Sequence, residues 1–383
     1  MSVSIDGRPI HVLLLCESLA ATGGVERFVC ELGNALAARG MKVTLGNVDT
    51  ARERVVYAVD ARVRVVSACR RLPVEGARTR LGRGLVILRT RWRVGRTLGG
   101  LIDAERPDVI LLNGLVTACS VLAWKRGARA RSICCDHNHF TARSRLWQRL
   151  RARIYPQVGA VVSLTEADLP KFAALNGNTR VIANTSSLHA DAPALPAAPR
   201  VLAVGRHQAQ KGFDLLLRAW REVVRELPEA RLRIVGEGPL GAALARLAIE
   251  LGVASSVVWT APTDRVETLY REAAVFVLSS RYEGMPLALL EAQALGVPAV
   301  AFDCPTGPRE IVSAETGVIV PAEDVAALAQ AMVRLLRDPD LRARMASAAI
   351  ARSRAVFSRE RQLDAWAALI DEVALAQRAK VAP

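Results

Sequence analysis

Short apolar runs alternate with amphipathic stretches along most of the 383-residue chain. Each apolar run predicts a buried strand, and the stretch after it predicts a helix whose apolar residues recur every three or four positions. The predicted strands are 10–16, 43–47, 63–66, 109–113, 132–135, 160–164 and 180–182, followed by 201–204, 232–235, 257–260, 275–279, 299–302 and 318–320. This alternation is typical of parallel sheets covered by helices, so we expect an α/β fold.

A proline-rich segment divides the two strand series. Pro193, Pro196 and Pro199 follow one another within ten residues, and Asp191 is the single charge among them. Such a composition is typical of a linker. We therefore predict an N-terminal Rossmann-like domain over 1–190, a linker over 191–199 and a C-terminal Rossmann-like domain over 200–358. Because ligands of such sheets bind beyond the carboxyl ends of the strands, the cleft between the domains is the expected site.

The positive charge is concentrated in the first half of the chain. The whole sequence has 52 Lys and Arg against 37 Asp and Glu, and residues 1–195 hold 29 and 15 of them, a net charge of +14. Residues 70–96 hold nine arginines and one acid, and residues 143–153 hold five arginines and none. Tryptophan and leucine between the arginines favour an interfacial helix on anionic lipid over a groove for nucleic acid, although a solvated basic surface is the alternative. The candidate membrane contacts are Arg89, Arg91, Trp92, Arg93, Arg145, Trp147 and Arg149.

The lengths of the apolar runs and the spacing of the cysteines argue against a membrane-spanning helix, a signal peptide and a cysteine metal site. No apolar stretch approaches the roughly 18–20 residues that span a bilayer, and the run from His11 to Cys16 is too short for a signal peptide. Seven cysteines without metal-ligand spacing predict reduced, buried thiols. We therefore expect a cytoplasmic protein, peripheral at the inner face of the cell membrane.

The most informative motif is Glu283-Gly284-Met285-Pro286, which follows the strand at 275–279. Pro286 suits the first turn of a helix that continues to about Leu295 and contains Glu291. Free backbone N–H groups at that helix start can bind an anion, and the two carboxylates can accept hydrogen bonds from sugar and ribose hydroxyls.

A second motif places two cations around a turn. Gly205 ends a strand, Arg206 follows it, and Lys211-Gly212 comes five residues later. Backbone N–H groups with two fixed positive charges are what a diphosphate requires, although two solvated cations around a loop are the alternative.

Two further motifs follow strands of the first half. Gly23-Gly24-Val25-Glu26 lets backbone approach a ligand closely, but it is neither a dinucleotide fingerprint nor a P-loop. His137 lies in Asp136-His137-Asn138-His139, directly after the strand at 132–135, and a structural histidine is the alternative to a catalytic one.

Taken together these motifs resemble glycosyltransferase family 4, whose retaining enzymes have the GT-B fold of two facing Rossmann-like domains. The resemblance is strongest at Val204-Gly205-Arg206, Lys211-Gly212, Gly236-Glu237-Gly238-Pro239 and Glu283 to Glu291, and Cys304 to Glu310 resembles a loop of envelope-glycan members. It implies a last helix, about 359–383, that packs back on the first domain.

The resemblance also implies roles. Arg206 and Lys211 would bind the diphosphate of a nucleotide-sugar, preferably a UDP-sugar, with Gly205 at the same turn. Gly23 and Gly24 would approach that diphosphate from the other domain. Glu283 with Gly284, Met285, Pro286 and Leu287 would hold the transferred sugar, Glu291 the ribose, and His137 would lie near the anomeric carbon.

The implied reaction is metal-independent hexosyl transfer, with no cofactor, to a lipid-linked or lipopolysaccharide-type acceptor, and no nucleic acid is expected as a partner. Two alternatives stay open: a related sugar-nucleotide epimerase, and a non-catalytic nucleic-acid-binding protein suggested by the isoelectric point near 10.4.

Overall fold

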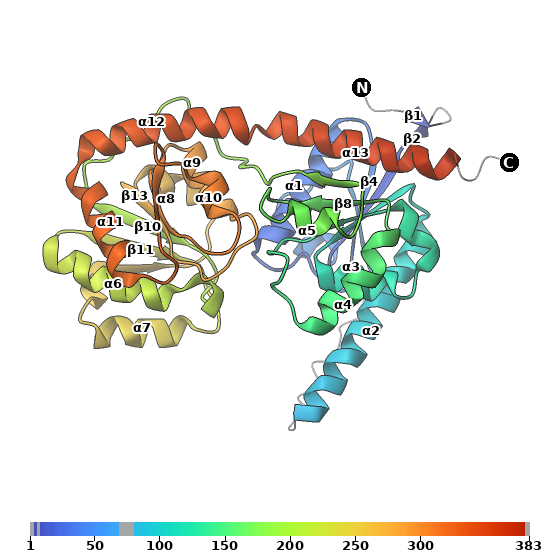
Figure 1. The fold of residues 1–383 in the computed structure, drawn as a ribbon, viewed down its shortest axis with the longest axis horizontal. Helices are drawn as coiled ribbons and strands as arrows, with labels where there is room; N and C mark the ends of the chain where they lie inside the picture. Colours follow the sequence, from blue (N-terminus) through green and yellow to red (C-terminus); the bar gives the residue numbers. More distant parts are fainter. Residues whose placement is uncertain (1–3, 6–7, 69–79, 380–383) are drawn as a thin grey trace. The chain divides into compact units, whose positions relative to one another are not determined.

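The computed structural model describes residues 4–5, 8–68 and 80–379. The chain divides into two compact units, an N-terminal unit of Met1–Ile182 with Glu360–Pro383 and a C-terminal unit of Ala183–Arg359. Each unit is a parallel sheet covered by helices (Figure 1). The predicted α/β architecture of two Rossmann-like sheets is confirmed.

The N-terminal unit contains a seven-stranded parallel sheet in the order β5-β4-β3-β6-β7-β8-β9. Its strands are β3 (His11–Leu15), β4 (Lys42–Asn47), β5 (Arg64–Ser67), β6 (Val109–Asn113), β7 (Ser132–Cys135), β8 (Ala160–Ser163) and β9 (Thr179–Val181). A two-stranded antiparallel ladder, β1 (Ser4–Ile5) with β2 (Arg8–Pro9), precedes it. The central strands are buried on both faces, which is why they appear in the sequence as continuous apolar runs.

Helices cover both faces of this sheet. One face packs, through alternate strand residues such as Leu13 and Leu112, against α2 (Arg80–Glu105), α3 (Leu115–Leu122), α4 (Arg145–Ile154) and α5 (Leu169–Ala173). The other face carries α1 (Gly24–Ala38), where a side chain at Gly33 would strike Leu45.

The last helix of the chain, α13 (Arg359–Ala379), belongs to the N-terminal unit. The Asp364 carboxylate pairs with Arg39, the C-cap residue of α1, at 2.7 Å, and Glu372 accepts a hydrogen bond from Asn178 at 2.8 Å. The Trp366 ring, 2% exposed, lies 5.8 Å from that of Phe28. The helix therefore forms part of the layer that contains α1.

The C-terminal unit contains a six-stranded parallel sheet in the order β12-β11-β10-β13-β14-β15. Its strands are β10 (Arg200–Val204), β11 (Arg231–Val235), β12 (Val257–Thr260), β13 (Val275–Leu278), β14 (Ala299–Phe302) and β15 (Gly317–Val320). One face packs against α6 (Phe213–Glu226), α7 (Gly241–Glu250) and α11 (Val325–Arg337). The helices α8 (Val266–Arg271), α9 (Leu287–Ala294), α10 (Pro308–Ile311) and α12 (Pro339–Val356) complete the unit.

The unit boundary lies after Ile182, before the predicted linker of 191–199. The segment that follows Ile182 is attached to the C-terminal unit: the Ala190 N–H donates to the Ala294 carbonyl, and Arg354 pairs with Asp191 at 2.6 Å. Proline content alone does not reveal this attachment, because it depends on partners far along the chain.

The described parts of the two basic runs lie mainly on α2 and α4, and α3 packs against both of these helices (Figure 1). The predicted run over 70–96 begins in residues 69–79, which are outside the described residues. Within the part of the chain that the structure describes, no helix has the length and apolarity to cross a membrane.

Candidate active site

The C-terminal unit brings Lys211 and Glu283 into direct contact. Lys211 ends a short 3-10 turn, Ala209–Lys211, after β10, and Glu283 follows β13, the next strand of the sheet. Their Nζ and Oε1 atoms are 2.7 Å apart, and the Ser280 hydroxyl donates to the same Oε1 at 2.6 Å. Because the Glu283 side chain is only 6% exposed, the lysine and the hydroxyl are the partners that satisfy this buried oxygen.

Gly205 determines where the lysine lies. A Cβ at this position would stand 3.0–3.1 Å from three carbons of the Lys211 side chain, closer than ordinary packing permits. The lysine stem therefore crosses the Gly205 backbone, and its ammonium is held beside Glu283. Arg206, which follows Gly205, is exposed.

The loop before α9 is supported on two sides. The Met285 carbonyl accepts a hydrogen bond from Asn184 at 3.1 Å, and the Thr306 hydroxyl donates to the Glu283 carbonyl at 2.9 Å. Gly307, at φ +90°, approaches so closely that a Cβ would lie 2.5 Å from the Gly284 carbonyl oxygen. The backbone of Gly284, Met285 and Pro286 is therefore fixed in one position.

Helix α9 begins one residue later than predicted, because Pro286 is its N-cap residue and Leu287 its first member. No described side chain caps this helix start, so its first N–H groups can bind an anion. Glu283 is the carboxylate next to this position.

A salt bridge joins the two loops. Arg281 donates to both carboxylate oxygens of Asp214 at 2.9 and 2.7 Å and to the Ala209 carbonyl at 2.8 Å. Gly212, at φ +60°, fits against the same loop: a Cβ there would lie 2.0 Å from the Ser279 carbonyl oxygen. The turn that carries Lys211 and the loop that carries Glu283 therefore form one rigid assembly.

Glu291 lies inside α9 and is 3% exposed. Its Oε2 accepts a hydrogen bond from the Tyr270 hydroxyl of α8 at 2.8 Å. Glu291, the residue predicted to bind the ribose, is thus oriented by Tyr270, which belongs to none of the sequence motifs.

His137 of the N-terminal unit follows β7 and is held by Asn113 at the end of β6. The Asn113 amide N–H donates to the Leu15 carbonyl, so its Oδ1 accepts from His137 Nε2 at 3.0 Å. The histidine proton is therefore on Nε2, and Nδ1 is left as an acceptor. The Phe28 ring of α1 packs edge-on against the imidazole at 4.8 Å and also contacts Trp366.

Gly23 and Gly24 start α1 after β3 in the same unit. Gly23 is its N-cap residue, and no described side chain caps the helix. The two glycines thus place another set of backbone N–H groups beyond the end of a central strand.

Burial lowers the pKa of His137 from 6.5 to about 4, so the imidazole is neutral at pH 7. The unfolded chain therefore binds a proton that the folded chain does not between pH 6.5 and 4, and stability falls as the pH falls through this range. We expect His137→Gln, which keeps a donor for Asn113, to reduce the difference in thermal midpoint between pH 7 and pH 4.5. A difference equal to that of the wild type would contradict the burial of a neutral imidazole.

The candidate membrane contacts on α2 differ in their exposure and in their partners. Arg89, Trp92 and Arg93 are exposed on α2, whereas Arg91 pairs with Glu17. Trp124, in the turn after α3, packs on Trp92 with ring centroids 5.8 Å apart and is 55% exposed. Trp124 lies outside the two basic runs on which the prediction rests, although Lys125, Arg126, Arg129 and Arg131 follow it.

On α4 the exposed residues are Arg145, Leu146, Arg149, Ala152 and Arg153. Trp147, a predicted membrane contact, is half-buried and packs against the core of the N-terminal unit. Leu146, 57% exposed, is the large apolar side chain that this helix presents to solvent.

Within the described residues, no three His, Cys, Asp or Glu side chains gather as metal ligands would. The described cysteines are buried free thiols: Cys16, Cys30, Cys119, Cys134, Cys135 and Cys304. Burial raises the pKa of the Cys304 thiol, which is near Glu283, to about 12, so it stays protonated.

Solved structures identify the class of fold. A sucrose-phosphate synthase from Thermosynechococcus elongatus superposes with a TM-score of 0.81 over 96% of this chain and 100% of its own, at 23% identity. WaaG, a glycosyltransferase involved in lipopolysaccharide biosynthesis, superposes with a TM-score of 0.70 over 94% and 99%, at 16% identity. The architecture is the GT-B fold.

Sequence comparisons identify the family. Residues 198–338 match the family described as glycosyl transferases group 1, and residues 23–185 match the glycosyl transferase 4-like domain. A D-inositol 3-phosphate glycosyltransferase from Streptomyces scabiei is 30% identical over 91% of this chain and 85% of its own. The amylovoran biosynthesis glycosyltransferase AmsD from Erwinia amylovora is 29% identical over 88% and 93%. The chain belongs to the family 4-like GT-B glycosyltransferases.

Proposed function

We propose that this chain is a retaining hexosyltransferase that moves a sugar from a nucleoside-diphosphate sugar, preferably a UDP-sugar, to a lipid-linked or lipopolysaccharide-type glycan at the inner face of the cell membrane. The observation that carries the proposal is the Lys211 ammonium, fixed across Gly205 and 2.7 Å from Glu283, beside the uncapped start of α9. This arrangement offers a cation, a carboxylate and backbone donors for a sugar diphosphate.

Each group has a part in the transfer. Lys211 and Arg206 bind the diphosphate and stabilise its charge as it leaves, with no metal ion. Glu283 and the backbone of Gly284 to Leu287 hold the sugar hydroxyls, and Glu291 holds the ribose. His137, a neutral imidazole with a free acceptor at Nδ1, accepts a hydrogen bond from a sugar hydroxyl.

The transfer itself requires no nucleophilic carboxylate. The acceptor oxygen forms a bond to the anomeric carbon on the face from which the phosphate departs, while the bond from that carbon to the phosphate oxygen breaks. The acceptor proton passes to the leaving phosphate oxygen. The products are a glycoside of unchanged anomeric configuration and a nucleoside diphosphate.

Two relatives support the acceptor class. AmsD acts in amylovoran biosynthesis and WaaG in lipopolysaccharide biosynthesis, according to their descriptions. Incubating the chain with UDP-, GDP- and ADP-sugars, in the presence of EDTA and with or without a lipid-linked glycan extract, tests the proposal. We expect product, with retained configuration, only when both donor and acceptor are present. Conversion of donor alone would indicate an epimerase instead.

Docking to anionic lipid is part of the proposal and rests on the exposed side chains of α2. We expect Arg89→Gln with Arg93→Gln to weaken binding to vesicles containing phosphatidylglycerol by roughly 30-fold, since each basic side chain at such a surface contributes about 1 kcal/mol. Arg91 is left unchanged because it pairs with Glu17.

The matched control is Arg218→Gln with Arg221→Gln, which removes the same charge from exposed positions on α6 of the C-terminal unit. Equal loss of vesicle binding in the two double variants would show that total charge, not the α2 surface, determines docking.

A further inference from the structure

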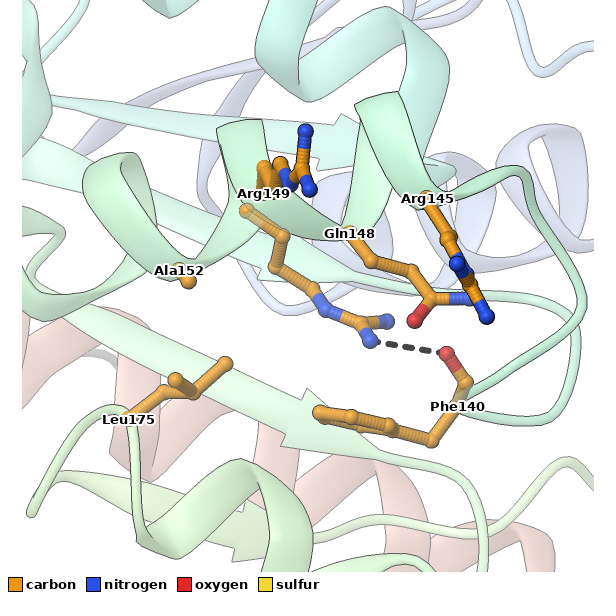
Figure 2. A pocket seen from close by; sticks show the side chains of 7 residues that line it. Phe140, Arg145, Gln148, Arg149, Ala152 and Leu175 are labelled. Carbon is orange, nitrogen blue, oxygen red and sulfur yellow. Dashed lines mark hydrogen bonds between the residues drawn. The ribbon is translucent and has the colours of Figure 1, made fainter.

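A groove opens beside helix α4 on the N-terminal unit (Figure 2). The helix contributes one stripe, since the groove-lining residues 145, 148, 149 and 152 are three or four positions apart. The loop after β7 contributes Phe140, and the segment after α5 contributes Leu175.

The groove is polar at one end and apolar at the other. Arg145 and Gln148 extend toward the end where Phe140 lies, and Ala152 and Leu175 lie at the opposite end (Figure 2). Gln148 is held in place because its amide donates to the Arg143 carbonyl at 2.7 Å. A ligand that matches the whole groove therefore has both a polar head and an apolar segment.

The groove has a net positive charge. Arg145 and Arg149 are exposed, and no acidic residue occurs from 143 to 153. The third arginine of the lining, Arg151, is 1% exposed and pairs with Asp136 at 3.2 Å, so its charge is balanced. The head group that complements Arg145 and Arg149 is an anion.

Arg151 also makes the groove floor rigid. It donates to the Phe140 carbonyl at 2.7 Å (Figure 2), and its guanidinium stacks 3.5 Å from the centre of the Phe140 ring. Asp168 accepts the Phe140 N–H at 2.7 Å and pairs with Lys171. The Phe140 ring is thus fixed in position with the Arg151 guanidinium against it, and Arg145 extends toward the same end of the groove (Figure 2).

We propose that this groove binds one molecule of an anionic membrane phospholipid. Its phosphate lies between Arg145 and Arg149, and the first carbons of an acyl chain extend over Phe140 toward Ala152 and Leu175. A soluble phosphate would leave the apolar end exposed to water, whereas a lipid buries it. The proposal rests on the proposed function, which places the chain at an anionic lipid surface, and it adds a saturable site for a single lipid.

The test uses the full chain and monomeric short-chain lipids, so that no bilayer surface is present. Dihexanoyl-phosphatidylglycerol below its critical micelle concentration is titrated and binding is followed by calorimetry. Dihexanoyl-phosphatidylcholine tests the need for negative charge, and glycerol 3-phosphate tests the need for the acyl chains. We expect saturable one-to-one binding of the phosphatidylglycerol and at least tenfold weaker binding of the other two.

Two groove variants and their controls assign the site. Arg145→Gln with Arg149→Gln should weaken binding by roughly 30-fold, whereas Arg89→Gln with Arg93→Gln should leave it unchanged. Ala152→Phe fills the groove without changing the charge and should abolish binding, whereas Ala351→Phe, at an exposed position of α12, should not. Retained binding of a nucleoside diphosphate shows that each variant is folded.

Wild-type affinity retained in Ala152→Phe, or binding of glycerol 3-phosphate as tight as that of the lipid, would overturn the proposal. The outcome is separable from the proposed function. Loss of the lipid site with intact binding of nucleoside diphosphate would refute only the groove. A chain that binds the lipid but no nucleoside diphosphate would refute the donor assignment and leave the groove in place.

Discussion

Lys211→Ala is expected to lower the rate of sugar transfer by roughly 10²-fold or more, as the loss of other preorganised electrostatic groups does. In the proposed function, the substitution removes the cation that faces the departing diphosphate. It also leaves the buried Glu283 carboxylate with the Ser280 hydroxyl but without its counterion. Initial rates of nucleoside diphosphate release, measured with saturating acceptor, report the change.

Lys171→Ala is the matched control. Lys171 pairs with Asp168 at 2.7 Å, and the Asp168 side chain is 4% exposed, so its loss also removes the counterion of a buried carboxylate. We expect this variant to transfer sugar at close to the wild-type rate. An equal loss of activity in both variants would mean that losing a salt bridge, not losing a diphosphate ligand, causes the effect.

Among substitutions that add one methyl group to the Lys211 turn or the Glu283 loop, we expect Gly212→Ala to reduce stability and sugar transfer most. Its φ of +60° is unfavourable for alanine by about 1 kcal/mol, and the added Cβ would lie 2.0 Å from the Ser279 carbonyl oxygen. Relief requires the Lys211 turn to move away from the Glu283 loop, which adds roughly 1–3 kcal/mol. We expect a loss of about 2–4 kcal/mol in the free energy of unfolding and a loss of transfer of at least roughly tenfold.

Gly252→Ala separates the energetic cost of the positive φ from that of the close contact. Gly252 has a similar φ of +71°, but nothing lies within 4 Å of a Cβ at this position. It should lose only about 1 kcal/mol and keep its activity. If the two variants are equally destabilised in urea unfolding, the close contact with Ser279 has no energetic consequence, and the rigid coupling of the two loops is wrong.

Much of the fold could be predicted because each strand is an apolar run that ends at a polar turn. Strands β6 and β12 begin and end where the pattern places them, at Val109–Asn113 and Val257–Thr260. The break between α11 and α12 lies at Asp338-Pro339, and the Asp338 side chain caps α12 by accepting the Leu341 N–H at 2.8 Å. Local sequence determines such features.

Contacts between distant residues could not be predicted in this way. Glu283 and Lys211 were each recognised from a motif, but their pairing depends on β10 and β13 being neighbours in the sheet. Asn113, Tyr270 and Ser280 are ordinary residues in the sequence, and they became relevant only as partners of His137, Glu291 and Glu283. A single sequence carries no signal for such pairs.

The basic surface shows the same limit. Arginine spacing identified both helices, but it could not show that Glu17 pairs with Arg91 or that Trp147 packs inward. It also could not indicate that Trp124, in the turn after α3, would pack on Trp92 of α2.

The central claim is that the C-terminal unit binds a nucleoside diphosphate through Lys211. Thermal unfolding in the presence of UDP, GDP, ADP and CMP, each without metal, tests it most directly. A ligand at about 100 times its dissociation constant stabilises the folded state by roughly 2.7 kcal/mol, a shift that is easily measured. We predict that one nucleoside diphosphate, most readily UDP, raises the midpoint of the wild type and of Lys171→Ala but not of Lys211→Ala. No shift with any of the four nucleotides, or an equal shift in Lys211→Ala, would contradict the claim.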